Sequence, residues 1–335
     1  MIDFVGRRRW FFLISAIMIG ISIISVAVVG LRPGIDFTGG TSLTINFVPK
    51  MEQSESAQFQ SQLREEMTAL GYTEAIIQFR KESHDFFVRT KFVSTEEVNE
   101  LKEHLEVVFG RDVEISVPLE MSPTVAAKTA RNATIAVAIA AVAMLLYIAW
   151  AFRRMPKPFR WGTCAIIAIA HDVIIIVGIF SLLGWLANVE VDAMFITGLL
   201  AVTGYSINNT VVIFDRIREN MSKGISRDFA VTVNSSIVET LGRSLNTGLT
   251  TLFVLLALFL FGGATIHYFV LVLLLGVTIG TYSSICISGE LLVTWEEGKW
   301  TRLSSWLPFA RRTAQSSKTY LLSSLSPHRC HCEEH

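Results

Sequence analysis

The sequence predicts an α-helical polytopic membrane protein with six transmembrane helices and one α+β extracytoplasmic domain. Hydrophobic residues make up 51% of the 335 residues and charged residues only 17%, whereas a soluble domain carries about 25% charge. The apolar residues are concentrated in long stretches, and one long polar segment, 32–132, interrupts them. This distribution indicates a membrane-embedded bundle with a folded domain inserted after its first helix.

The charge balance and the cysteine content exclude other classes of protein. Lys and Arg number 29, as do Asp and Glu, so the formal net charge is zero. Such a chain has neither the overall basic surface of a nucleic-acid-binding protein nor the charge excess of a disordered one. Four cysteines are too few for a disulfide-stabilised scaffold.

Six apolar stretches are long enough to cross the bilayer. The first, Trp10 to Leu31, has no charged residue, and at ~1.5 Å per residue it spans the ~30 Å hydrocarbon core. The others are 133–152, 163–186, 192–214, 237–261 and 267–292. The first stretch exceeds the ~7–15 apolar residues of a signal peptide and no convincing Ala-x-Ala site follows, so we expect it to be retained.

Basic residues predict the orientation of the spans. The short loops on one side carry Arg7, Arg8, Arg9, Arg153, Arg154, Lys157, Arg160, Arg216, Arg218, Lys223 and Arg227, and the alternate loops 187–191 and 262–266 carry none. We therefore predict a multi-pass protein of the cytoplasmic (inner) membrane with both termini in the cytoplasm. Its parts are the N-terminus with span one (1–31), the extracytoplasmic domain (32–132), spans two to six (133–295) and a flexible tail (296–335).

The polar segment 32–132 predicts a ferredoxin-like domain in the order β-α-β-β-α-β. Strands with alternating apolar residues are expected at 42–48, 75–81, 85–90 and 113–117, and apolar residues at helical spacing predict a helix at 59–70. Ser94 and Glu97 form a capping box that begins a second helix, closed by Gly110. His84 and His104 lack metal-ligand spacing, and we expect both at the solvated surface.

Ionisable and amide side chains inside the spans are candidates for function, because they are costly in hydrocarbon. His171 and Asp172 in span three form either an internal hydrogen-bonded pair that fixes helix packing or a proton-accessible pair. Tyr205 and Asn209 in span four share one helix face, next to Asn208. The sequence leaves both interpretations of the His–Asp pair open.

Two charged pairs lie where spans four and five meet the interface. Asp215 and Arg218 are three residues apart and are expected to pair. Glu239 and Arg243 are four apart, so they form either an edge pair or, alternatively, leave Arg243 inside the bundle facing a polar group of span four. Glu290, at the end of span six, is expected at the interface.

Other patterns carry less information. Gly276 and Gly280 form a G-x-x-x-G motif, which is frequent in apolar segments. Cys164 and Cys286 fall in spans and are expected to be packing residues. The tail ends in Cys330, Cys332 and several histidines, but a second ligand cluster is missing and we predict no metal site.

The string Arg32–Thr41 directly follows the first span. Pro33 disfavours a helical Arg32, and three glycines permit left-handed backbone conformations. The absence of a terminal Gly-Lys-Ser/Thr excludes a phosphate-binding loop. We therefore predict a specific turn from the membrane into the domain.

Several strings carry a resemblance to a known family: Leu31–Thr41, His171–Val173, Gly204–Asn220, Glu239–Gly263 and Gly276–Ser284. Together with the layout of six spans and one outward domain, they resemble the SecF members of the SecD/SecF family of protein-export membrane proteins, over residues 1–295. The tail beyond residue 298 has no counterpart in the resemblance.

The resemblance implies a fold and a function. SecF proteins resemble half of an RND-type bundle, which a SecD-like subunit completes as a heterodimer. The implied role is an accessory subunit of the Sec machinery that couples the proton gradient to late steps of preprotein translocation through SecYEG. The implied partners are the SecD-like subunit, the SecYEG channel, YajC, the translocating preprotein and membrane lipids, and neither nucleic acid, cofactor, metal nor catalytic residue is implied.

The resemblance also assigns residues to the site. The proton-coupling and intramembrane polar candidates are Asn209, Arg243, Asn208, His171 and Asp172, and the interface and structural-motif positions are Asp36, Gly39, Gly40, Asp215 and Arg216. The family commonly has Asp at the position of Asn209, and an amide carries no proton at any relevant pH. Either the partner's carboxylate carries the proton alone, or His171 and Asp172 contribute, or coupling is weak, and we favour the first.

Two other functions compete with this one. A stand-alone RND-type exporter of lipid or small molecules would self-associate or contain two related halves, and this sequence contains one six-span half. An intramembrane enzyme would need a nucleophile–base or metal constellation such as H-E-x-x-H or G-x-S-x-G, and the sequence contains neither. We therefore expect no enzymatic activity.

Overall fold

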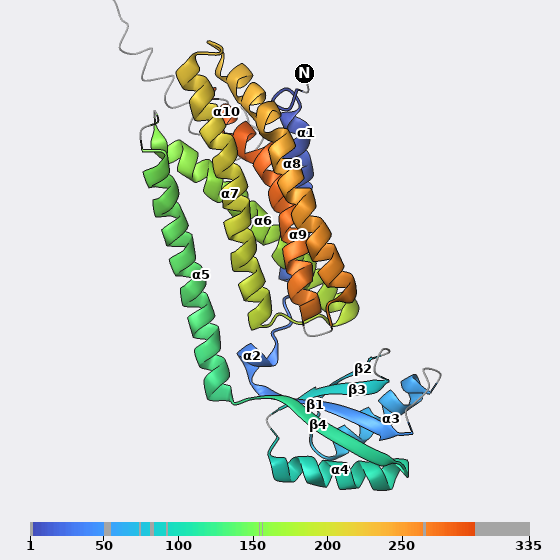
Figure 1. Ribbon diagram of the computed structural model, residues 1–335. Coiled ribbons are helices and arrows are strands. Elements are labelled where there is room, and N and C mark those ends of the chain that lie inside the picture. Colours follow the sequence, from blue (N-terminus) through green and yellow to red (C-terminus); the bar gives the residue numbers. More distant parts are fainter. Residues whose placement is uncertain are drawn as a thin grey trace, which may run out of the picture.

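A bundle of long helices carries a small α+β domain at one end, and the N-terminus lies at the other end (Figure 1). This computed structural model describes residues 3–49, 55–73, 75–80, 84–91, 93–153, 155, 157–263 and 266–298. The predicted tail, with its cysteines and histidines, lies outside the described residues from 299 onward.

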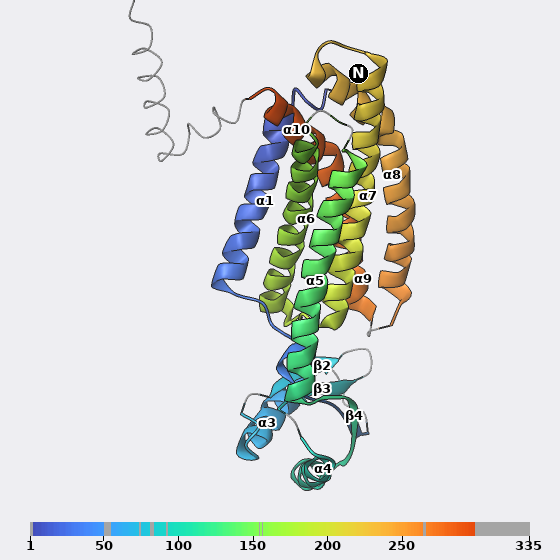
Figure 2. The same ribbon diagram turned by 90° about the vertical axis from the view of Figure 1, so that its left-hand side faces the viewer.

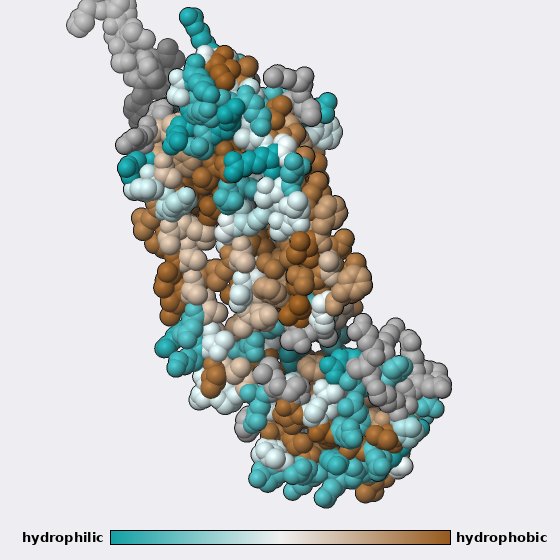
Figure 3. Space-filling view, in the orientation of Figure 1, coloured by the Kyte–Doolittle hydropathy of each residue, from teal (hydrophilic) through white to brown (hydrophobic). Residues whose placement is uncertain are grey.

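The six predicted spans are confirmed, because six helical segments are long and apolar enough to cross a membrane. They are α1 (Arg8–Val28), α5 (Pro123–Ala151), α6 (Pro158–Ala187), α7 (Ala193–Lys223), α8 (Phe229–Phe261) and α9 (His267–Ser283), which continues through the π-helical η2 (Ser284–Ser288) into α10 (Gly289–Glu296). Figure 3 shows hydrophobic side chains gathered over this bundle between hydrophilic ends.

The helix ends differ from the predicted span ends where capping residues set them. The second span was expected from residue 133, but α5 begins at Pro123, where the side chain of Ser122 accepts a hydrogen bond from the Val125 N–H and proline occupies the first turn. Hydropathy marks only the part of a helix that crosses hydrocarbon, so the polar first turns of α5 escape a hydropathy search.

The inserted domain has the predicted ferredoxin-like topology. Its elements are α2 (Ile35–Thr38), β1 (Gly40–Val48), α3 (Ser56–Ala69), β2 (Ile76–Arg80), β3 (Asp85–Thr90), α4 (Thr95–Phe109) and β4 (Asp112–Met121). The sheet is antiparallel with strand order β2-β3-β1-β4. Both halves of the predicted capping box at Ser94 and Glu97 are present.

One face of this sheet is covered by α3 and α4, and the other is turned toward the bundle. Leu43, Ile45 and Phe47 of β1 pack into the core with Leu63 of α3 and Leu105 of α4. The alternate face carries the domain's polar contacts with the bundle, and α4 lies on the far side (Figures 1 and 2). His84 is exposed as expected, whereas His104 is half-buried and bonds to Glu66 at 2.8 Å.

Small residues form the seams of the bundle, and large apolar residues lie outside. The buried residues of α1 are Ser15, Ser22 and Ser25, while its isoleucines are largely exposed, which suits a helix that faces lipid. A Cβ on Gly178 of α6 would meet Ser22 within 2.2 Å, so α1 and α6 lie in close contact (Figure 2).

The G-x-x-x-G motif forms the seam between α9 and α7. A Cβ on Gly276 would lie 2.1 Å from Val202, and one on Gly280 would lie 3.1 Å from Ser206. The motif therefore has a structural role here, because it brings the two helices close enough for Ser206 and Ser283 to bind the same carboxylate, that of Asp172.

Candidate functional site

A buried polar network joins four helices around Asp172. Nδ1 of His171 lies 2.9 Å from Oδ1 of Asp172, and the hydroxyls of Ser206 and Ser283 donate to its Oδ2 at 2.5 and 2.8 Å. On the other side of the ring, Nε2 of His171 lies 3.0 Å from Oγ of Ser15. His171 and Asp172 are 4% and 1% exposed, so this network lies within the protein rather than in lipid.

The network continues from His171 to the first helix. Oγ of Ser15, which lies 3.0 Å from Nε2 of His171, is 3.3 Å from the hydroxyl of Tyr282, and Tyr282 donates to the carbonyl of Phe11 at 3.1 Å. This geometry fits the internal hydrogen-bonded pair, one of the two interpretations considered above, because the buried pair is linked by hydrogen bonds to three other helices.

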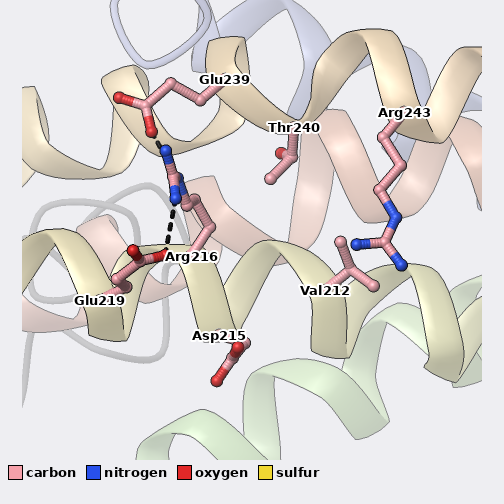
Figure 4. A pocket seen from close by; sticks show the side chains of 7 residues that line it. All are labelled: Val212, Asp215, Arg216, Glu219, Glu239, Thr240 and Arg243. Atoms are coloured by element: carbon pink, nitrogen blue, oxygen red, sulfur yellow. Dashed lines mark hydrogen bonds and ion pairs between the residues drawn. The ribbon is translucent and has the colours of Figure 1, made fainter.

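The second polar region is a cavity of about 270 Å³ between α7 and α8 (Figure 4). It lies in the half of these helices that is nearer the N-terminal end of the bundle (Figure 1). Arg216 binds Glu239 at 2.5 Å and Glu219 at 2.6 Å. Asn220 also donates to Glu239, at 3.1 Å. The lining residues are Val212, Asp215, Arg216, Glu219, Glu239, Thr240 and Arg243.

Two expectations about these charges have different outcomes. Asp215 and Arg218 pair at 2.5 Å, as predicted. The edge pair between Glu239 and Arg243 is wrong, because Glu239 instead reaches across to Arg216 of the facing helix. An inter-helix partner competes with a partner on the same helix, and spacing along one helix does not reveal it.

Arg243 lines this cavity from α8, about halfway along the helix, and its side chain is exposed. Its guanidinium points toward Val212 of α7 and away from the Arg216 cluster (Figure 4). Within the described part of the chain it makes no ion pair. The alternative that turned Arg243 toward span four agrees with this direction, but the side chain is exposed rather than buried inside the bundle.

Several buried polar groups of α7 also lack hydrogen-bond partners among the described residues. Asn209 is 4% exposed, and its Nδ2 has no hydrogen-bond partner in the described structure. The same holds for the buried hydroxyls of Tyr205 and Thr210, while Asn208 is exposed. Each unsatisfied buried group costs about 1–3 kcal/mol, so this region is far less complete than the Asp172 network.

Glu290 is a polar group whose place was predicted wrongly. It was expected at the interface, but it is completely buried, and neither carboxylate oxygen has a hydrogen-bond partner among the described residues. The preceding Gly289 allows α10 to pack closely against Val233 and Ile237 of α8. Cys164 and Cys286 are buried packing residues, as predicted.

The string after span one is joined to the loop before α7 by backbone hydrogen bonds. The Gly34 N–H donates to the Val191 carbonyl at 2.7 Å, and the Val191 N–H donates to the Arg32 carbonyl at 2.8 Å. A Cβ on Gly40, whose φ is +135°, would lie 2.5 Å from the Thr90 carbonyl, and one on Gly39, whose φ is +75°, would lie 3.0 Å from Pro123. Both glycines are therefore required by close backbone contacts.

Asp36 of the same string caps a membrane helix. Its Oδ2 accepts a hydrogen bond from the Ala193 N–H at 2.9 Å, at the beginning of α7. The junction thereby connects the string to the helix that carries Asn209. The sequence showed the string but not its partner, the loop 188–192.

Comparison with known proteins gives consistent matches. A family model described as "Protein export membrane protein SecD/SecF, C-terminal" matches residues 101–298, and a "SecD/SecF GG Motif" model matches residues 24–50. The chain is 41% identical over 314 residues to the protein translocase subunit SecF of Thermobaculum terrenum, covering 90% of this chain and 96% of that protein.

Longer relatives contain a second half. The protein translocase subunit SecDF of Bacillus subtilis is 33% identical over 300 residues, which cover 88% of this chain and 38% of that protein. A crystal structure of SecDF, a translocon-associated membrane protein from Thermus thermophilus, matches with a TM-score of 0.74 at 34% identity, covering 88% of this chain and 39% of that one. The chain thus spans about two fifths of the length of these SecDF proteins.

Proposed function

The chain belongs to the SecD/SecF family of protein-export membrane proteins, and we propose that it is the SecF-type half of a pair that uses the proton gradient to draw preproteins across the membrane. It is a multi-pass membrane protein with an accessory role in Sec export. The similarity to SecDF proteins, in which both halves lie in one chain, supports pairing with a SecD-like subunit. The SecYEG channel, YajC and the preprotein are the further partners that we propose.

The observation that carries the proposal is the exposed Arg243 halfway along a membrane-spanning helix. A charged residue costs about 2.5–3.5 kcal/mol on insertion scales at the centre of such a helix and less toward its ends, and Arg243, near the start of the apolar stretch 237–261, bears part of that cost when nothing compensates it. Asn209, at whose position the family commonly has an aspartate, offers no charge to neutralise it. A carboxylate from the SecD-like partner, placed opposite Arg243, would complete the site and carry the proton.

The arrangement of charges along the bundle supports one orientation of the chain in the membrane. The described basic loop residues lie at the end opposite the α+β domain, which supports a cytoplasmic position for the termini and an extracytoplasmic one for the domain (Figure 1). Each elementary charge that crosses is worth about 2.3 kcal/mol per 100 mV. We assign no hydrolytic chemistry to this chain, because in this proposal the gradient supplies the energy.

The test reconstitutes the chain with a SecD-like subunit and the SecYEG channel in vesicles. A proton gradient is imposed, and protease-protected preprotein is measured over a pH series. Arg243→Ala is expected to abolish the gradient-dependent part of translocation while the amount of assembled complex stays unchanged. The arginine is exposed and makes no ion pair within the described chain, so its loss breaks no internal ion pair.

Arg218→Ala is the matched control, since Arg218 is also an exposed arginine, paired only with Asp215 three residues away. It should translocate like the unmodified chain. Normal translocation by Arg243→Ala at every pH would show that Arg243 is only a surface charge. Full activity without a SecD-like subunit would instead favour a stand-alone exporter.

A further inference from the structure

The α+β domain is docked on the loop before α7 by several side chains. Gln78 of β2 donates to the Asn188 carbonyl at 3.3 Å, and Arg89 of β3 forms an ion pair with Glu190. Arg32, just before the domain, donates to the Asn188 side chain. These contacts add to the backbone hydrogen bonds between residues 32–34 and Val191, so strands and string hold the same short loop.

Arg89 is the centre of this junction. Both members of its ion pair with Glu190 are largely buried, and the carboxylates of Asp36 and Asp192 also act on it electrostatically. Burial lowers the pKa of Arg89 to about 10, and those two carboxylates oppose the shift. An arginine remains charged at any physiological pH, so the burial must be compensated by the surrounding acids.

The loop held in this way is the start of α7. Asp192 caps the helix by accepting a hydrogen bond from the Phe195 N–H at 2.8 Å, and Asp36 accepts one from the Ala193 N–H. Two of the backbone N–H groups that have no acceptor within the helix therefore donate to residues of the junction. One of these residues, Asp36, belongs to the string that leads into the domain. A helix of this length is stiff, so a displacement at its first turn moves the side chains farther along.

We propose that Arg89 and Asp36 are positioning residues that make the α+β domain and α7 one moving unit, so that displacement of the domain by a passing preprotein shifts Asn209 and the α7–α8 cavity. This inference rests on the proposed export function for its biological meaning. The structural claim is narrower: the domain stays docked on the loop 188–192 during the working cycle, and Arg89 holds it there.

Charge exchange tests the contact that carries the proposal. Arg89→Glu and Glu190→Arg are each expected to reduce gradient-dependent translocation by roughly tenfold, within the range known for residues that couple distant sites. The double exchange should recover part of the activity, because it restores an opposite pair while the carboxylate now at position 89 still faces Asp36 and Asp192. Amide hydrogen exchange at Ala193 and Phe195 should be faster in each single variant and intermediate in the double variant.

A covalent lock tests whether the junction must open. In a chain whose four cysteines are replaced, Gln78→Cys and Asn188→Cys are joined by a short thiol-reactive linker. The linked chain is expected to translocate like the same variant before linking. Loss of activity on linking would overturn the proposal, since it would show that the domain must leave the loop. Each cysteine alone, treated with the same reagent, is the control.

The two proposals fail in distinguishable ways. If the unmodified complex shows no gradient-dependent translocation, the proposed function fails, while hydrogen exchange still reports whether Arg89 holds the start of α7. If translocation is normal but Arg89→Glu changes neither activity nor exchange at Ala193, the junction has no positioning role and this inference is wrong.

Discussion

The polar network around Asp172 and the α7–α8 cavity lie in the same bundle but differ in completeness. In the network, both carboxylate oxygens and both ring nitrogens have partners within the chain. In the second region, Arg243 has no ion pair and the Asn209 amide nitrogen has no acceptor within the described residues. The first region therefore needs no group from outside this chain, and the second is the one that the proposed pairing with a SecD-like subunit would complete.

The largest effect should come from breaking the complete region. Asp172→Ala removes the acceptor of two serines and the partner of His171, and loss of one member of a buried pair typically costs about 3–5 kcal/mol. We expect the variant to be poorly recovered from membranes and to unfold at a much lower temperature. Thermal unfolding of the purified chain in detergent measures this.

Asp172→Asn is the sharper variant, because it keeps the shape of the side chain and removes only the possibility of a negative charge. An asparagine can accept from both serines through its oxygen and donate to Nδ1 of His171 through its nitrogen. It should therefore keep most of the stability that Asp172→Ala loses. Equal destabilisation by both substitutions would show that the network requires a charged carboxylate.

A smaller effect of opposite sign is expected at Glu290. Like Arg243, this carboxylate has no polar partner among the described residues. Unlike Arg243, it is completely buried, so a partner subunit cannot reach it. Glu290→Met, of similar volume, should raise the stability by about 1–2 kcal/mol, because it removes unsatisfied buried oxygens. The midpoint of thermal unfolding measures the change, with Glu296→Met at the surface as the control. A lower midpoint would mean that Glu290 has a partner in the folded protein.

The smallest effect concerns pH at the junction. Burial raises the pKa of Asp192, and the nearby Asp36 adds to the shift. A raised carboxyl pKa means that its contribution to the docked state is fully present at acid pH and is lost as pH rises through the folded-state pKa. The protection of the Phe195 amide, which is its exchange rate relative to an unfolded amide at the same pH, should therefore rise as the pH falls, and Asp192→Asn, which keeps the capping oxygen, should weaken this dependence. If Asp192→Ala changed exchange at Phe195 by the same factor at every pH, Asp192 would not be the titrating group.

Particular residues show how far sequence reasoning reached into the site. His171, Asp172, Asn209 and Arg243 stand out because polar groups are rare in spans, and the structure places each of them as an identifiable part of one of the two polar regions. Ser15, Ser206 and Ser283 were missed, since serine is common in membrane helices. The spacing of Ser15, Ser22 and Ser25 on one face of an apolar helix was the signal that could have found the first of them.

The sequence by itself determined the six spans, the ferredoxin-like order of strands and helices, and the turn after span one, because hydropathy, strand alternation and capping depend on residues close together in the chain. Only the tertiary structure decided that Glu239 binds Arg216, that Glu290 is buried, and that Asp36 caps α7. Those contacts join segments far apart in sequence, and partners on different helices compete for the same charge. Local spacing cannot rank such partners, since their distances are set by how the helices pack.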